Sequence, residues 1–168
     1  MTMVDTNRRL TIIGHLPLNH DLRGFYRTVM VIGGLLLAIW GVLWIAADGF
    51  GGDGASVGGL QANGTFGVLS VLMGLALVVA AVLGRNLDHW LGFLIAGLAM
   101  LLGVFGLTFV RTTPEPFALS VSTCVALLSF GTVIICAASY VGTGTPDDAR
   151  HRQRAIGHLT SAEYEAGN

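Results

Sequence analysis

Lysine is missing from this sequence, and charge of either sign is scarce. Charged residues make up 11% of the 168 residues, and all nine basic residues are arginine. A soluble domain carries about a quarter of its residues as charged ones, so this composition excludes an ordinary soluble domain. The length leaves room for one small bundle and for no separate soluble domain.

Long apolar segments stand where charges are absent. The chain is 53% hydrophobic, with a mean hydropathy of +0.71. A transmembrane helix needs about 20 mainly apolar residues, and its backbone groups must be satisfied internally. Four segments meet this length, and none has an Asp, Glu, Arg or Lys in its interior: about 28–47, 64–83, 90–110 and 117–141. The sequence therefore predicts an all-α fold, an integral membrane four-helix bundle over residues 28–142.

The arginines predict the orientation of the bundle. One side of the predicted spans has a single arginine, Arg111, and the other side has the remaining eight: Arg8, Arg9, Arg23, Arg27, Arg85, Arg150, Arg152 and Arg154. Because basic residues concentrate in cytoplasmic segments, we expect both termini in the cytoplasm, as tails of residues 1–27 and 143–168. The first 27 residues contain no apolar run, so we expect no cleavable signal peptide before the first span.

The loop between the first two spans, residues 48–63, should then lie outside the cell. It contains Asp48 and Asp53, no basic residue, and six glycines between Gly49 and Gly59. A glycine-rich linker is flexible in isolation, so we expect a flexible loop unless a partner orders it. Trp40 and Trp44 lie one turn apart near the outer end of the first span, as anchoring aromatic residues do.

Small residues at four-residue spacing indicate where helices pack. Helices associate in lipid through close approach, which small residues allow. The candidate contact residues are Gly92 with Ala96, Ala99 with Gly103, and Ser70 with Gly74. The second and third spans are joined by only about six residues, so we expect them to form a tight antiparallel hairpin.

Ionisable residues are missing from the interior of all four spans, which argues against several functions. A small multidrug antiporter needs a membrane-embedded carboxylate, and a transmembrane haem needs axial ligands that are usually histidines at depth. Four of the five histidines lie outside the spans, in the two tails. Cys124 and Cys136 are twelve residues apart on one predicted helix, or about 18 Å, and cannot bridge each other. We expect no catalytic residue, no cofactor ligand and no metal ligand, and a bound lipid is compatible with this composition.

The fifth histidine lies at the corner Asp88-His89-Trp90, at the start of the third span. One interpretation gives His89 a proton-handling or quinone-headgroup role, since imidazole titrates near neutral pH. The other makes it an interfacial residue or a helix-start hydrogen-bond partner, with Asp88 as the helix cap. The second interpretation is the more common one for such a residue.

The two tails contain the remaining candidate interaction residues, which are arginines. Arg8 and Arg9 precede an apolar stretch in the N-terminal tail, and Arg150, Arg152 and Arg154 follow a helix-capping pattern in the C-terminal tail. Contact with anionic lipid headgroups is one interpretation, and docking on a neighbouring protein is the other.

The stretch Asn86-Leu87-Asp88-His89-Trp90-Leu91-Gly92 resembles an Asn…His…Gly signature found in an uncharacterised family of small four-helix actinobacterial membrane proteins. The lack of lysine and the 24 glycines fit the same G+C-rich source. The layout also resembles the accessory subunits of the actinobacterial cytochrome bc–cytochrome oxidase supercomplex. That resemblance implies a subunit of the respiratory electron-transport chain without cofactors of its own.

Two functions of different classes follow. The first is a non-catalytic accessory subunit of a plasma-membrane complex, in contact with other subunits and phospholipid but with no nucleic acid. The alternative is a small homo-oligomeric transporter or channel. Its pore would be lined by hydroxyl groups of the fourth span: Ser120, Ser122, Thr123, Ser129 and Thr132.

Overall fold

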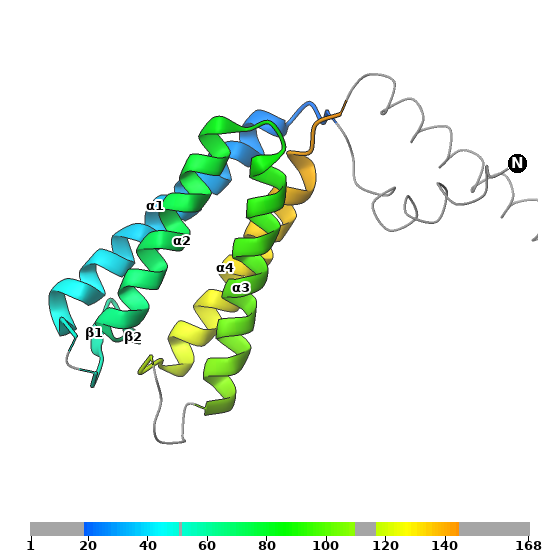
Figure 1. The fold of residues 1–168 in the computed structure, drawn as a ribbon. Coiled ribbons are helices and arrows are strands. Elements are labelled where there is room, and N and C mark those ends of the chain that lie inside the picture. The colour runs from blue at the N-terminus through cyan, green and yellow to red at the C-terminus, as the bar shows by residue number, and fades with distance from the viewer. Residues whose placement is uncertain (1–18, 51, 110–116, 145–168) are drawn as a thin grey trace, which may run out of the picture.

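The computed structural model describes residues 19–50, 52–109 and 117–144, and within them the fold is four long helices with one short hairpin (Figure 1). The helices are α1 (Arg23–Asp48), α2 (Gly64–Leu83), α3 (Leu87–Phe109) and α4 (Val121–Tyr140), and strands β1 (Ala55–Val57) and β2 (Leu60–Ala62) lie between α1 and α2. All four helices are long and apolar enough to cross a membrane. The prediction of an all-helical, multi-pass membrane protein is thus confirmed at this level.

The helix boundaries follow local capping. The predicted second span coincides with α2, which begins after Asn63, whose side-chain Oδ1 accepts a 2.9 Å hydrogen bond from the backbone N–H of Phe66. The helix α4 begins at Val121, later than the predicted residue 117, because Ser120 caps it and residues 117–120 pair with the hairpin segment instead. The other two helices begin earlier than predicted, at Arg23 and Leu87. Both early starts bring a charged residue into a helix.

Helices α1 and α2 are in direct backbone contact at two pairs of glycines. A β-carbon at Gly34 would lie 2.7 Å from the carbonyl oxygen of Gly74, and one at Gly67 would lie 2.7 Å from that of Gly41. In each helix the two glycines are seven residues apart, so they fall on one face. Such close approach gains dispersion contacts that larger side chains would prevent.

Helices α3 and α4 form the second close pair. Gly92 packs on Ala138, and Gly103 lies so close to α4 that a β-carbon there would be 2.9 Å from the Cys124 carbonyl oxygen. Ala96 and Ala99 are fully buried on the same face of α3. The predicted tight hairpin of the second and third spans is wrong, since α2 and α3 share far fewer contacts than either close pair. The short turn therefore joins two helix pairs. The small residues of α2 face α1 and those of α3 face α4, so they do not face each other.

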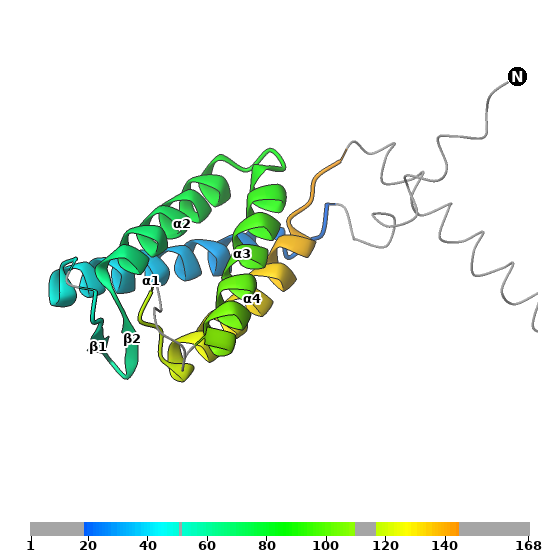
Figure 2. The same cartoon turned by 60° about the horizontal axis from the view of Figure 1, so that its bottom comes forward.

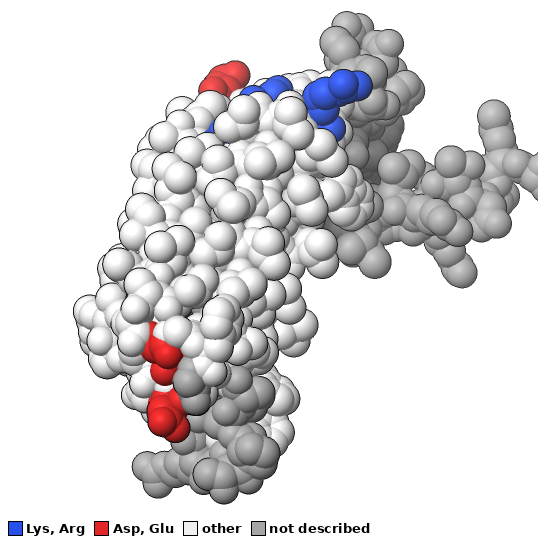
Figure 3. Space-filling view, turned by 60° about the vertical axis from the view of Figure 1, so that its left-hand side comes forward, with Lys and Arg blue, Asp and Glu red and all other residues white. Residues whose placement is uncertain are grey.

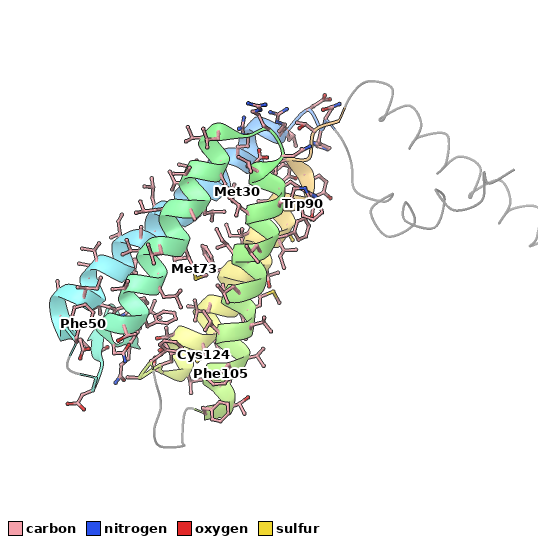
Figure 4. The ribbon with its side chains drawn as sticks, viewed as in Figure 1. Met30, Phe50, Met73, Trp90, Phe105 and Cys124 are labelled. Carbon is pink, nitrogen blue, oxygen red and sulfur yellow. The ribbon has the colours of Figure 1, made fainter. Side chains whose placement is uncertain are left out.

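The core lies between the two helix pairs. Met30 of α1 and Met73 of α2 point into it (Figure 4) and are 0% and 6% exposed. Leu77 of α2, Ile95 of α3 and Ile134 of α4 complete it, each 4% exposed or less. Ser70, predicted as a packing residue, is also buried, at 1%, and its hydroxyl has no hydrogen-bond partner among the described residues.

The loop expected to be flexible is a folded hairpin held by side chains from both helix pairs. Its strands pair antiparallel, with Ser56 opposite Gln61. The indole N–H groups of Trp40 and Trp44 donate to the carbonyl oxygens of Val57 and Leu60, at 3.3 and 3.2 Å. Figure 2 shows the hairpin at the end of the bundle where α2 and α4 begin. The expectation of flexibility is wrong for the described part of this loop, because the protein itself supplies the ordering contacts.

Two further groups fix the hairpin. The Asp48 carboxylate accepts hydrogen bonds of 3.0 Å from the backbone N–H groups of Gly54 and Gly64. From α4, the hydroxyl of Thr123 donates to the Gln61 carbonyl oxygen at 2.7 Å, and that of Ser122 to the Gly59 carbonyl oxygen at 2.7 Å. The hairpin therefore joins α1 to α4 at this end of the bundle.

We expect Gly74→Ala to destabilise the protein, because its new methyl group would overlap the backbone of α1 near Gly34 and Ala38. Overpacking of this kind costs about 1–3 kcal/mol. Thermal unfolding in detergent micelles, followed by circular dichroism, measures the loss. The matched control is Gly97→Ala, since nothing lies within 4 Å of a β-carbon at Gly97. An equal loss in both variants would contradict the close α1–α2 packing.

Candidate functional site

The Asp88-His89-Trp90 corner lies at the end of the bundle where α1 and α3 begin and α4 ends (Figure 1). The three side chains have different surroundings. Asp88 is 0% exposed, His89 is half-buried, and Trp90 is 64% exposed at the outer surface of α3 (Figure 4).

Asp88 forms a buried ion pair with Arg27 of α1. The Arg27 Nε lies 3.1 Å from the Asp88 Oδ2, and the two side chains are 26% and 1% exposed. The contact is ionic without good hydrogen-bond geometry, since neither of these two atoms has a hydrogen-bond partner in the described part of the chain. A buried carboxylate away from its cation is strongly unfavourable, so this pair holds the start of α3 against α1.

This ion pair corrects two expectations. Arg27 and Asp88 lie just outside the predicted spans 28–47 and 90–110, yet both are within helices, so the helices themselves are not free of charge. Asp88 is not the expected cap of the third helix. It lies in the first turn, where its Oδ1 accepts a 3.0 Å hydrogen bond from the backbone N–H of His89 and its Oδ2 faces Arg27.

The turn between α2 and α3 is tied to the segment that follows α4. Gly84, Arg85 and Asn86 all have positive φ angles, of 65°, 54° and 66°. Residue 84 is a glycine with no side chain, and the Arg27 guanidinium occupies the position that a β-carbon would take there. The Asn86 Oδ1 accepts hydrogen bonds from the backbone N–H and the hydroxyl of Thr143, at 2.6 and 2.7 Å. Its Nδ2 donates to the Thr143 carbonyl oxygen at 2.8 Å, so one side chain satisfies three groups.

The described ends of the chain meet at the same corner. The Asn19 backbone N–H donates to the Gly142 carbonyl oxygen at 3.1 Å, and its side-chain Nδ2 donates to that of Gly144 at 2.8 Å. Beside them the rings of Tyr26 and Tyr140 stack with centroids 4.8 Å apart. The N-terminal and C-terminal tails therefore leave the bundle from neighbouring points.

His89 connects α3 to α4. Its Nδ1 lies 2.8 Å from the Ala138 carbonyl oxygen, so in the neutral ring Nδ1 carries the proton and Nε2 is left as the acceptor. The ring also makes edge contacts with Trp90 and Phe93, at centroid distances of 5.6 and 5.0 Å. The contact differs from the expected helix-start hydrogen bond, because its partner is a carbonyl of the last turn of α4, and the proton-handling interpretation stays a prediction.

The remaining candidates are placed as follows. Cys124 is buried and Cys136 is exposed, both on α4. Within the described ranges no three His, Cys, Asp or Glu side chains gather in a group that could hold a metal ion. The candidate interaction residues of the tails lie outside the described residues: Arg8, Arg9, Arg150, Arg152 and Arg154.

Sequence reasoning missed three residues of this corner, namely Arg27, Asn19 and Thr143. The sequence did contain a signal for Arg27, since Arg27 and Asp88 each border an apolar run at the same end of the bundle. Nothing in the sequence linked Asn19 to the end of α4, because that contact depends on backbone carbonyls.

Comparison with known proteins finds no relative of this chain. No family model matches the chain, and neither a curated protein nor a solved structure matches it. The two resemblances given by the sequence therefore stay predictions.

We expect Arg27→Met to lower the free energy of unfolding by about 3 kcal/mol, because it leaves the buried Asp88 carboxylate without its cation. The double variant Arg27→Met/Asp88→Asn should recover most of this loss, since both charges are gone. Denaturation in mixed micelles measures the double-mutant cycle. Arg23→Met, one turn away, is the control. If the losses of Arg27→Met and Asp88→Asn simply add up in the double variant, the two side chains do not interact, and the ion pair would be contradicted.

We expect Asn86→Gly to release the segment after α4, since it removes three hydrogen bonds to Thr143 but keeps the positive φ. Amide hydrogen exchange should show faster exchange at Thr143, by about tenfold for each 1.4 kcal/mol lost. Arg85→Gly changes the same turn without removing a described hydrogen bond and should leave Thr143 protected. Unchanged exchange in Asn86→Gly would show that other contacts hold the segment.

Proposed function

We propose that this protein is a non-catalytic accessory subunit of a multi-subunit membrane complex, and that it acts by helix packing and tail docking. The observation behind the proposal is the contrast between the outward faces of its helices. Those of α1, α2 and α3 carry large aliphatic side chains, such as Leu35, Leu72 and Leu101, which are 45–69% exposed. The outward face of α4 carries three exposed valines, Val121, Val125 and Val133, and beside them the small residues Ser129, Thr132 and Cys136.

The three small residues on the outward face of α4 are suited to contact with another helix. Residues 129, 132 and 136 follow one another at three- and four-residue spacing, so they form one stripe along α4. Large aliphatic side chains already match lipid tails, whereas small ones let a second backbone come close. This stripe therefore supports a transmembrane helix of a neighbouring subunit as the partner of α4.

A separate apolar groove lies on a different side of α4 from this stripe, where residues 123, 126, 127 and 130 line it. The groove runs between α1 and α4 and has a volume of about 120 Å³. Its walls include Leu36 and Trp40 of α1, Leu60 of the hairpin, and Ala126 and Phe130 of α4. The indole N–H of Trp40 is already bonded to Val57, so the groove offers apolar contact rather than a hydrogen bond.

The hydroxyl groups considered for a pore have partners inside the chain. Ser129 and Thr132 donate to backbone carbonyl oxygens four residues earlier, both at 2.9 Å. Ser122 and Thr123 donate to the hairpin, and Ser120 lies 2.8 Å from the Ser122 hydroxyl. A pore built on Ser129 and Thr132 could use only their oxygen atoms as acceptors, since the hydroxyl hydrogens already bond within the chain.

The proposal also includes the orientation of the chain in the membrane and a role for the N-terminal and C-terminal tails. The distribution of arginine supports placing both termini in the cytoplasm and the hairpin outside the cell, in the plasma membrane. Both tails leave from the Asn19–Gly144 contact, so they can reach one partner together. A respiratory cytochrome oxidase supercomplex is our candidate complex, and that choice rests on the resemblance of the sequence alone.

The test is purification through a tag on this chain in mild detergent. We expect haem-absorbing subunits to co-purify in fixed stoichiometry with the unmodified protein and with Val79→Phe, whose site on α2 is 53% exposed. Ser129→Phe should lose them, because the bulky ring fills the stripe on α4. A colourless homo-oligomer that moves solute in liposomes would overturn the proposal, as would an unchanged complex in Ser129→Phe.

A further inference from the structure

Three arginines gather at the end of the bundle where α1 begins. Arg23 and Arg27 are four residues apart on α1 and so share one face. Arg85 directly follows Gly84, against which the Arg27 guanidinium packs. In Figure 3 the blue atoms lie at this end of the molecule together with one red group, whereas the charged atoms coloured at the opposite end are red. The three side chains form a cluster, which we call the arginine cluster.

Two of the three arginines of this cluster have no ion pair in the described part of the chain. Arg27 is paired with Asp88, whereas Arg23 and Arg85 have no ion pair within the part of the chain that the structure describes. The other described carboxylate at this end is the exposed Asp21. Three arginines therefore face two aspartates, one of which is buried, and the surface is left with positive charge.

The cluster lies at the boundary between water and hydrocarbon. On α1 the uncharged apolar stretch begins directly after Arg27. At the same end, Phe25 and Trp90 are 61% and 64% exposed, which is the usual place for aromatic residues at the headgroup level. Leu22 and Leu87 are also exposed, at 54% and 44%, so apolar surface adjoins the arginines.

We propose that Arg23, Arg27 and Arg85 bind the phosphate of an anionic phospholipid. Guanidinium groups present planar pairs of N–H donors that match phosphate oxygens. Arg27 is held by Asp88 and Gly84, so its remaining N–H groups are positioned before the ligand arrives, which lowers the entropy lost on binding. The exposed Phe25 and Leu87 are placed to contact the glycerol and the upper acyl chains. The proposal rests on the membrane location and is independent of the complex proposed above.

The experiment titrates the purified full chain in detergent with phosphatidylglycerol and counts bound lipids by native mass spectrometry. Phosphatidylcholine with the same acyl chains is the neutral comparison. We expect tighter binding of phosphatidylglycerol, weakened about fivefold by Arg23→Gln, about fivefold by Arg85→Gln, and by the product in the double variant. The variant Arg23→Lys/Arg85→Lys keeps the charges but loses the paired N–H donors, so it should bind phosphatidylglycerol more weakly than the unmodified protein and more tightly than Arg23→Gln/Arg85→Gln.

The matched control is Arg111→Gln, which removes the same charge from the opposite side of the predicted spans and should leave phosphatidylglycerol binding unchanged. Arg27 is left in place because its loss would disturb the fold. Several results would overturn the proposal: equal binding of both lipids, unchanged binding in Arg23→Gln/Arg85→Gln, or an equal loss in Arg111→Gln. Inorganic phosphate that displaces the lipid at equal concentration would overturn it too, by showing a site for free phosphate.

Discussion

The contact between the backbones of α1 and α2 is the constraint on which the rest of this fold depends. Inside a bilayer the hydrophobic effect does not bring helices together, so they must gain their attraction from close packing. Gly34 with Gly74, and Gly41 with Gly67, let the two helices meet at backbone distance. The same device joins α3 to α4 at Gly92 and Gly103. Packing at these positions divides the bundle into two pairs.

Polar contacts at both ends connect the two pairs to each other. At one end the hairpin receives hydrogen bonds from Trp40 and Trp44 of α1 and from Thr123 of α4. At the other end Arg27 reaches Asp88, and Asn86 binds Thr143 beyond α4. This arrangement follows from the solvent. Polar groups are tolerated where the bilayer meets water, and only apolar or self-satisfied groups are tolerated between.

This division explains which features the sequence could predict. The number of helices follows from the lengths of the apolar runs, and the predicted second span matches α2 because Asn63 and Gly84 bound both the apolar run and the helix. The starts of α1 and α3 were missed because counting apolar residues stops at Arg27 and at Asp88. Neither charge reveals its partner on another helix.

The predictions of a flexible first loop and of a tight hairpin between the second and third spans were wrong for similar reasons. Glycines at 49–59 indicate flexibility when the loop is taken alone, but the bonds that order the hairpin come from tryptophans on α1 and hydroxyls on α4. A short connection also suggested that α2 and α3 pack tightly. Which helices pair is decided by the faces on which the small residues lie, and these became visible only once the helices were placed against one another.

The two proposals concern different depths of the membrane and different forces. The stripe on α4 lies within the apolar part of its helix and would bind through close packing, while the arginine cluster lies at the headgroup level and would bind through charge. A lipid phosphate at Arg27 would also add negative charge beside the pair with Asp88, and the guanidinium would then bridge two anions. Because a ligand that binds only the folded state stabilises it, anionic lipid would strengthen the corner that joins α1 to α3. The stability of this end of the bundle would then depend on the composition of the surrounding leaflet, and the packing of α4 on its partner would not.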